Sequence, residues 1–406
     1  MARFHGWVAV APVAAATCLF VVFVGYHLSV PFVNMEQAYA LSAMEVVKQC
    51  VSYPLLEYRN RWGAVNPEGV LWLIAPFLWA FGFSEATARL SSLVFGLLAL
   101  SATYVFFRRF RPEVATVGTL VVLSNPMFGM NAAFISNDTY FFGLLTLDLF
   151  LWYRAIRSET RWLQAFCGFL WGFSIIVNAK GSLFLPLVLW MYWTGSGSSR
   201  EGRGWVRLKD AVVPLGLASC VVFSYLGFVV WKYGQLIEAH QYDAVRFRPL
   251  QVPSSIGAYL FWLALLIGPF WVLVIDDLWR SRWMKKALLP CLGLGASAVV
   301  LFLYSERLGE WRLPVWLTRG SLAGELIVFA LLVSMAALFL SRLVAFQMAA
   351  GDAVGWFFAI WLISAIVLYS VRFPIGRYSL EFLPPLAYFL TRMLWGWNPS
   401  GFRRVV

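Results

Sequence analysis

Long apolar runs recur along most of this 406-residue chain, and they limit what it can fold into more than any other feature. A run of roughly 20 apolar residues matches the hydrocarbon thickness of a bilayer when it is helical. Hydrophobic residues make up 61% of the sequence and charged residues 13%, against roughly 25% charged residues in soluble domains. The sequence therefore predicts an all-α integral membrane protein.

We predict about twelve transmembrane helices, within a range of about 10 to 13, from the positions of these runs. The first run is interpreted as a retained span, because a cleaved signal peptide has a shorter apolar region and a small-residue cleavage site. A single transmembrane domain over residues 1–406 is expected, with no separate soluble domain. The predicted spans are residues 7–30, 86–107, 114–130, 139–154, 162–178, 181–194, 211–231, 256–275, 287–304, 322–340, 353–371 and 378–395.

The formal net charge of +12 is concentrated in short segments between the spans. Basic connecting segments are typical of the cytoplasmic side of a membrane protein. This distribution of charge therefore indicates how the chain is oriented in the membrane and does not indicate a nucleic-acid partner. It predicts cytoplasmic N- and C-termini. The outer loops would then be residues 31–85, 131–138, 232–255, 305–321 and 372–377.

The first outer loop, residues 31–85, carries two helical patterns. Ala38, Leu41, Met44 and Val47 recur at three-residue spacing beside charged residues, which predicts an amphipathic helix lying on the membrane surface. The stretch that begins at Pro67 is strongly apolar and predicts a second interfacial helix or a shallow re-entrant one.

Two acids lie where apolar segments meet an outer loop. Glu36 precedes the amphipathic helix, and Asp138 stands at the start of the fourth span. Either acid could simply favour a helix N-terminus. A carboxylate at this depth is costly unless it is paired or faces a wet cavity, so both are also candidates for a functional site.

Basic residues gather in the same outer loops. Lys180 interrupts two apolar runs, Arg246 and Arg248 lie among aromatic residues, and Arg377 precedes the last span. A single basic residue at the membrane edge is usually an anchor. Several together, however, can hold a phosphate group. No spacing of the histidines or cysteines indicates a metal site or a disulfide framework.

The order of these motifs resembles the polyprenyl-phosphate-sugar-dependent glycosyltransferases of the GT-C type. The resemblance is to the branch that contains protein O-mannosyltransferases and the aminoarabinose transferase of lipid A. It rests on "AYALSAMEVV", "FISNDTYFF", "GFLWGFSIIVNAKGSLFLPL", "YDAVRFRPLQVPSSIGAYLFWLALLIGPF" and "GRYSLEFLPPLAYF". It also rests on a "FG.SE...R" pattern, formed here by Phe81, Gly82, Ser84, Glu85 and Arg89.

The resemblance implies transfer of a sugar from a polyprenyl phosphate, with inversion, at the outer leaflet. One carboxylate would take the acceptor proton while positive charge stabilises the leaving phosphate. Glu36 is the expected base, and Asp138 would orient the acceptor or share that role. Lys180, Arg246, Arg248 and Arg377 are the expected phosphate ligands, and Tyr39, Asn137 and His240 are expected around the other substrate groups.

The family opens its first outer loop with an Asp-Glu pair, whereas this chain has Met35 followed by Glu36. Either Glu36 acts as the base or the register differs. Two alternatives are kept: a catalytically reduced subunit of a larger membrane complex, which Met35 favours, and a transporter of a lipid or anion. No cofactor is expected to be required; a divalent cation is left open but is not indicated.

The expected partners are a polyprenyl-phosphate-linked sugar, membrane lipids and an acceptor that is a lipid, a glycan or a protein. The expected location is the bacterial inner membrane, with the active site on the periplasmic face.

Overall fold

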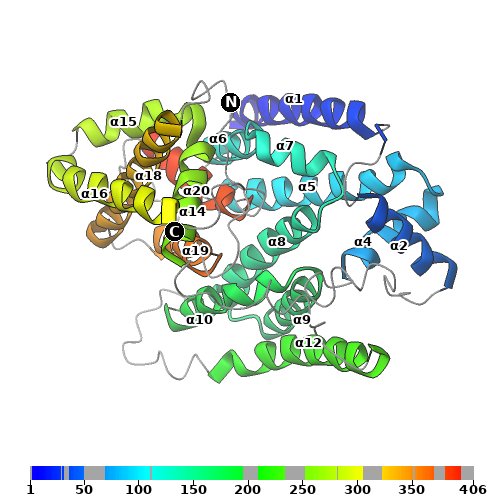
Figure 1. Cartoon of the computed structure of the whole chain (residues 1–406). Helices are drawn as coiled ribbons and strands as arrows, with labels where there is room; N and C mark the ends of the chain where they lie inside the picture. The colour runs from blue at the N-terminus through cyan, green and yellow to red at the C-terminus, as the bar shows by residue number, and fades with distance from the viewer. Residues whose placement is uncertain are drawn as a thin grey trace. The chain divides into compact units, whose positions relative to one another are not determined.

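The computed structural model describes the helical parts of the chain in detail. The described residues are 2–28, 30–31, 36–49, 69–109, 112–194, 209–233, 252–280, 282–304, 322–350, 353–369 and 380–394. All secondary structure within these ranges is helical (Figure 1). The predicted all-α class is confirmed for this part of the chain.

These residues pack as two units, Met1–Arg246 and Phe247–Val406. The prediction of one domain over residues 1–406 stays a prediction, and each unit is described by itself. Unit 1 contains α1 (Ala2–Leu28), α2 (Glu36–Gln49), α4 (Gly69–Phe81), α5 (Glu85–Arg108), α6 (Pro112–Leu123), α7 (Pro126–Ala133), α8 (Asn137–Arg157), α9 (Arg161–Val177), the short 3-10 helix η2 (Ala179–Phe184), α10 (Leu185–Thr194) and α12 (Val212–Tyr233).

The centre of unit 1 is the parallel pair α5 and α8. Near the start of both helices, the hydroxyl of Tyr140 hydrogen-bonds to that of Ser91 at 2.6 Å. Near their ends, the rings of Phe106 and Phe150 stack with centroids 4.1 Å apart. Because α5 has 24 residues and an α-helix rises about 1.5 Å per residue, the two ends of this pair lie about 35 Å apart.

α9 begins near the end of α8, and α12 packs closely along α9. A Cβ on Gly168 would lie 2.1 Å from the carbonyl oxygen of Pro214, and one on Gly172 would lie 2.7 Å from that of Ala218. The two backbones can therefore meet only because these positions lack a side chain. Further along, Ile176 packs with Tyr225 and Val229, so α9 and α12 also run parallel.

Unit 2 is a separate set of apolar helices. It contains α14 (Val252–Ile267), the 3-10 helix η4 (Gly268–Phe270), α15 (Trp271–Arg280), α16 (Arg282–Tyr304), α18 (Leu322–Ala350), α19 (Ala353–Tyr369) and α20 (Leu383–Leu394). α14 meets α18 through the stacked rings of Phe261 and Phe329, 5.4 Å apart. α19 meets α20 through Phe358 and Tyr388, with centroids 4.4 Å apart.

Three helices in the described part of the chain are long and apolar enough to cross a membrane: Glu85–Arg108, Val212–Trp231 and Ala323–Ala345. By length and composition they identify an integral membrane protein. Several predicted spans have shorter helices.

Two predicted spans are broken by local sequence signals. The span predicted at 114–130 divides into α6 and α7, because Asn125 caps a new helix whose first residue is Pro126. The span predicted at 256–275 is interrupted at Gly268, which adopts a left-handed backbone conformation with φ of 47° before Pro269. A hydropathy average does not detect either break.

The predicted helices of the first outer loop are both present. α2 covers Glu36–Gln49 and begins at the acid itself. α4 covers Gly69–Phe81 and is in contact with α2, with Val70, Leu71 and Ile74 buried. Pro67, where the second helix was expected to begin, lies outside the described residues.

Candidate functional site

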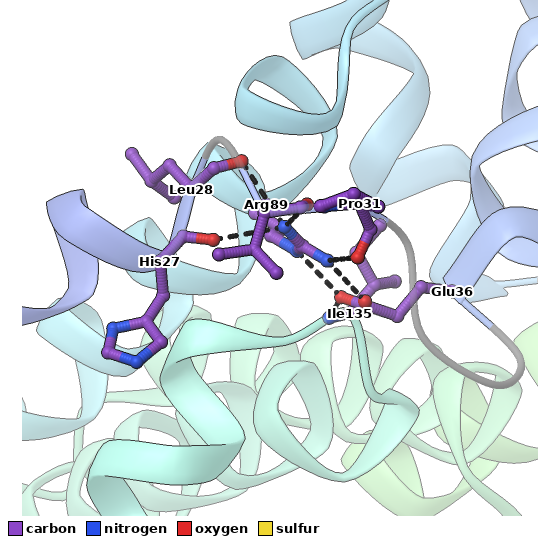
Figure 2. Close-up of polar contacts among 7 residues, drawn as sticks. His27, Leu28, Pro31, Glu36, Arg89 and Ile135 are labelled. Atoms are coloured by element: carbon purple, nitrogen blue, oxygen red, sulfur yellow. Dashed lines mark hydrogen bonds and ion pairs between the residues drawn. The ribbon is translucent and has the colours of Figure 1, made fainter.

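Glu36 and Arg89 form a buried ion pair between α2 and α5. The guanidinium donates from Nε to Oε1 at 2.9 Å and from Nη2 to Oε2 at 2.6 Å (Figure 2). The side chains are 4% and 0% exposed, respectively. Two parallel hydrogen bonds to both carboxylate oxygens are the geometry in which an arginine holds an acid most rigidly.

The same guanidinium also binds the end of α1. It donates to the carbonyl oxygens of His27 at 3.0 Å, Leu28 at 3.3 Å, Val30 and Pro31 at 3.1 Å. Carbonyls at a helix C-terminus have no intrahelical donor, so a buried cation there satisfies them. Figure 2 shows the His27 ring directed away from Arg89, and its Nδ1 lies 2.8 Å from the carbonyl oxygen of Phe23.

Glu36 reaches a third segment through its Oε1 atom. The backbone N–H of Ile135, just before α8, donates to this oxygen at 2.8 Å. Glu36 and Arg89 thus join four parts of unit 1: the end of α1, the start of α2, the first turns of α5 and the segment that leads into α8.

Asp138 and Lys180 form a second buried ion pair. The Nζ atom of Lys180 lies 2.5 Å from Oδ1 of Asp138, and the side chains are 4% and 0% exposed, respectively. The side-chain amide of Asn178 approaches the same oxygen at 3.4 Å. This pair connects the first turn of α8 to η2.

Local sequence signals hold both partners of this pair in place. Ser136 is the N-cap of α8, and its hydroxyl accepts from the backbone N–H of Asp138 at 3.3 Å. The capping role considered for Asp138 is therefore filled by Ser136, and the Asp138 carboxylate is directed to Lys180 instead. Asn178 ends α9, and its side chain accepts from the backbone N–H of Lys180 at 3.2 Å.

The two ion pairs hold the same short segment, residues 135–138. Glu36 binds its first backbone N–H, and Lys180 binds the side chain of its last residue. Consecutive Cα atoms are 3.8 Å apart, so these two anchor points are separated by no more than about 11 Å of chain. Two carboxylates and two cations are thus concentrated at one end of the α5–α8 pair, and Arg109, at the end of α5, lies at the opposite end.

Such a cluster has the groups needed for proton transfer and for stabilising a developing negative charge. A carboxylate can accept a proton, and a buried cation beside it can stabilise a phosphate oxygen. Among the described residues, no group of three or more histidine, cysteine, aspartate or glutamate side chains could hold a metal ion.

Of the other predicted site residues, the structure describes two and leaves the rest undescribed. Tyr39, on α2, and Asn137, the first residue of α8, are half-buried near this cluster. Arg246, Arg248, Arg377 and His240 lie outside the described residues, as does Met35. Their convergence with Lys180 stays a prediction, and so does a common cavity for Glu36 and Asp138.

The sequence reasoning gave no site role to Arg89, although it appears in the "FG.SE...R" pattern. The signal was present, because a charged residue inside an apolar helix is costly and needs a partner at the same depth. It also overlooked Asn178 as the residue that orients Lys180. The pairing of Arg89 with Glu36 could not be assigned from spacing, because 53 residues separate them.

Comparison with known proteins supports the resemblance in one part of the chain. Residues 65–229 match the family of dolichyl-phosphate-mannose-protein mannosyltransferases. The resemblance is confirmed over this range. The matched segment contains Arg89, Asp138 and Lys180, while Glu36 precedes it. No curated protein sequence matches the chain.

Two crystal structures of ArnT from Cupriavidus metallidurans are similar to this chain. The apo structure has 18% sequence identity, covers 99% of this chain and 78% of the ArnT chain, and gives a TM-score of 0.46. The structure bound to undecaprenyl phosphate has 19% identity, covers 98% of this chain and 77% of the ArnT chain, and gives a TM-score of 0.49. Similarity of this degree assigns no role to any residue.

Proposed function

We propose that this chain is a membrane glycosyltransferase that moves a sugar from a polyprenyl-phosphate carrier to an acceptor, with inversion at the anomeric carbon. The observation that carries the proposal is the buried Asp138–Lys180 pair, 2.5 Å apart, within the segment that matches the mannosyltransferase family. An acid and a cation held side by side are what an inverting transfer from a phosphate requires.

The contacts favour a division of roles that reverses the order expected from the sequence. Both oxygens of Glu36 already accept hydrogen bonds from Arg89, and Oε1 also accepts one from Ile135. Taking up a proton would disrupt contacts that join several helices. We therefore assign Glu36 to positioning the segment before α8, and we assign the base to Asp138.

In the proposed reaction the acceptor hydroxyl oxygen attacks the anomeric carbon and its proton passes to Asp138. The bond between the anomeric carbon and the phosphate oxygen breaks, and its electron pair stays on that oxygen beside Lys180. An ammonium has no fixed donor plane, so Lys180 can exchange Asp138 for the phosphate at small geometric cost. That exchange releases the carboxylate for proton transfer at the moment the donor is in place.

The remaining expectations belong to the same proposal. Arg246, Arg248 and Arg377 would add donors to the carrier phosphate, and Tyr39, Asn137 and His240 would contact the sugar or the acceptor. We propose about twelve spans, cytoplasmic termini and a site on the periplasmic side of a bacterial inner membrane. The proposal invokes no metal or other cofactor.

The test is sugar transfer by the full chain in liposomes, with polyprenyl-phosphate mannose as the first donor and release of polyprenyl phosphate as the readout. Asp138→Asn should lower the rate about 10²–10⁴-fold, the range typical for a lost general base. Glu36→Gln should keep measurable transfer, because the amide oxygen can still accept from Ile135. A folded Glu36→Gln protein with no transfer would return the base to Glu36.

Removing one partner of a buried ion pair also destabilises the fold, by about 3–5 kcal/mol. The double variant Asp138→Asn/Lys180→Met removes both charges and is therefore the control for stability. It should be more heat-stable than Lys180→Met alone, yet equally inactive. If the wild type releases no polyprenyl phosphate from any polyprenyl-phosphate sugar, the chain is better explained as a catalytically reduced subunit.

A further inference from the structure

Arginines gather at the opposite end of the α5–α8 pair from the two ion pairs. Arg109 follows the last residue of α5, and Arg154 and Arg157 lie in the last turn of α8. The guanidinium of Arg157 sits 4.5 Å from the ring centroid of Tyr153, and that ring meets Phe106 of α5 edge-on at 5.3 Å. The parallel course of α5 and α8 thus brings three cations together around one aromatic side chain.

These cations repel one another, and no acid is paired with them among the residues that the structure describes. The pKa of Arg109 is lowered from its ordinary value, first by desolvation and second by the charge of Arg154, while Tyr153 acts in the opposite direction. None of the three arginines makes an ion pair with any residue that the structure describes. Glu159, the nearest acid along the chain, is exposed and likewise has no ion pair within those ranges.

The helix ends offset only part of this charge. Each C-terminus carries roughly half a negative charge, so α5 and α8 together supply about one against three guanidinium groups. Arginine clusters of this kind bind phosphate through charge-assisted hydrogen bonds, and the aromatic face of Tyr153 holds one of the guanidinium groups in a fixed orientation.

Apolar surface lies directly beside the cluster. Val105 is 59% exposed and stands one helical turn before Arg109, on the same face of α5. A ligand that binds here therefore meets cations at the helix ends and an exposed aliphatic side chain one turn deeper. That combination fits a lipid, with its phosphate at the membrane surface and its chains along the helix.

We propose that Arg109, Arg154 and Arg157 bind the headgroup of an anionic phospholipid, in the leaflet opposite the Asp138–Lys180 pair. This site is separate from the proposed sugar transfer and does not depend on it. The lipid would stabilise the far end of the α5–α8 pair, about 35 Å from the reacting groups by helix geometry.

The experiment measures which lipids stay with the purified full chain. The protein is exchanged through mixed micelles of phosphatidylglycerol and phosphatidylcholine, and the retained lipids are quantified by mass spectrometry. We expect phosphatidylglycerol to be enriched in the wild type. In Arg109→Gln/Arg154→Gln its enrichment should fall roughly tenfold or more, since each basic side chain near an anionic headgroup contributes to binding.

The matched control is Lys209→Gln/Lys286→Gln, which removes the same charge at two exposed positions outside the cluster. This control should retain the enrichment, and Arg109→Lys/Arg154→Lys should keep most of it. An equal loss in the cluster and control variants would show a general charge effect and overturn the proposal. If the Gln variant does not fold, the Lys variant and the salt dependence of wild-type enrichment decide instead, since enrichment that survives high salt unchanged would contradict a headgroup site.

A further arm separates a lipid from a soluble anion. Inorganic phosphate and glycerol phosphate are added to the wild type in phosphatidylcholine micelles, and heat stability is compared with that in phosphatidylglycerol. We expect stabilisation by phosphatidylglycerol alone. Equal stabilisation by the soluble anions would mean that the cluster binds a free phosphate and not a lipid.

Discussion

The two buried ion pairs in the described part of unit 1 hold the same segment, residues 135–138, in different ways. Arg89 contacts Glu36 and a set of carbonyls at the end of α1, so its loss would release several elements together. The contacts of Lys180 described above lie between the first turn of α8 and the turn after α9. The contacts of the arginine pair described above reach α1, α2, α5 and the segment before α8, whereas those of the lysine pair reach α8 and η2.

The chemistry of the two cations explains this difference. A guanidinium is planar, permanently charged and presents its donors in a fixed fork, which suits a junction between rigid elements. An ammonium is a compact charge with rotatable donors, which suits a partner that must be exchanged during a reaction. Glu36–Arg89 is therefore suited to holding segments of unit 1 together, and Asp138–Lys180 is suited to exchanging one partner for another.

The largest loss of stability is expected for Arg89→Met. It leaves Glu36 buried without its cation, and breaking a buried pair in this way costs about 3–5 kcal/mol. The variant should lose most of its folded population in detergent, as measured by the temperature at which half the protein aggregates. Lys180→Met breaks a pair that joins fewer elements and should lower this temperature less.

Arg161→Met is the control for Arg89→Met, because it makes the same replacement at an exposed position at the start of α9. Its aggregation temperature should match that of the wild type. If Arg89→Met were as stable as this control, the arginine pair would not be a junction and the comparison would fail.

A smaller loss of stability is expected for Gly143→Ala, which tests the close approach of α5 and α8. A Cβ at this position would lie 2.5 Å from the carbonyl oxygen of Phe95 on α5, and backbone cannot move aside as a side chain can. Overpacking of this kind costs about 1–3 kcal/mol. The aggregation temperature should fall, and sugar transfer should fall with it because Asp138 shifts with α8.

Gly227 provides the matched control, since a Cβ there meets nothing within 4 Å in the middle of α12. Gly227→Ala should leave stability unchanged or raise it by up to about 1 kcal/mol through helix propensity. Equal behaviour of the two variants would show that α5 and α8 do not need their close approach.

Much of the fold could be predicted because the hydropathy that decides where a membrane helix forms is a property of short stretches of sequence. Apolar runs and the acid at Glu36 indicated α1, α2, α5 and α8 within a few residues of their ends. The breaks after α6 and at Gly268 were missed, since a window average counts Asn125 and Pro269 as minor interruptions of an apolar run. A cap and a left-handed glycine act through backbone geometry, which hydropathy does not represent.

The sequence predicted the acids of the candidate site, but it did not predict which cation pairs with each acid. Glu36 and Asp138 stood out because a carboxylate at a membrane edge is costly, and Lys180 stood out because it interrupts two apolar runs. Which cation meets which acid depends on how α2, α5, α8 and η2 pack, over separations of 53 and 42 residues. Sequence spacing carries no information at that range, so the interpretation of Glu36 as the base overlooked its engagement with Arg89.

The smallest effect is expected for Tyr140→Phe, and it tests whether the first turn of α8 is positioned for chemistry or only for stability. The Tyr140 hydroxyl hydrogen-bonds to Ser91 at 2.6 Å and accepts from Ser92 at 3.0 Å. Ser91 keeps a second partner in the carbonyl oxygen of Ala88. The stability loss should therefore be that of an ordinary buried hydrogen bond, about 0.5–1.5 kcal/mol.

Tyr192→Phe is the matched control, because it removes a buried tyrosine hydroxyl that donates to Gln164 at 3.1 Å on a different helix. Both variants should lose similar heat stability. Only Tyr140→Phe should slow sugar transfer beyond that loss, because Tyr140 lies two residues after Asp138 and fixes the rotation of its helical turn against α5. Equal rates in the two variants would mean that Asp138 is positioned without the help of Tyr140, and the Asp138–Lys180 pair would then be independent of α5.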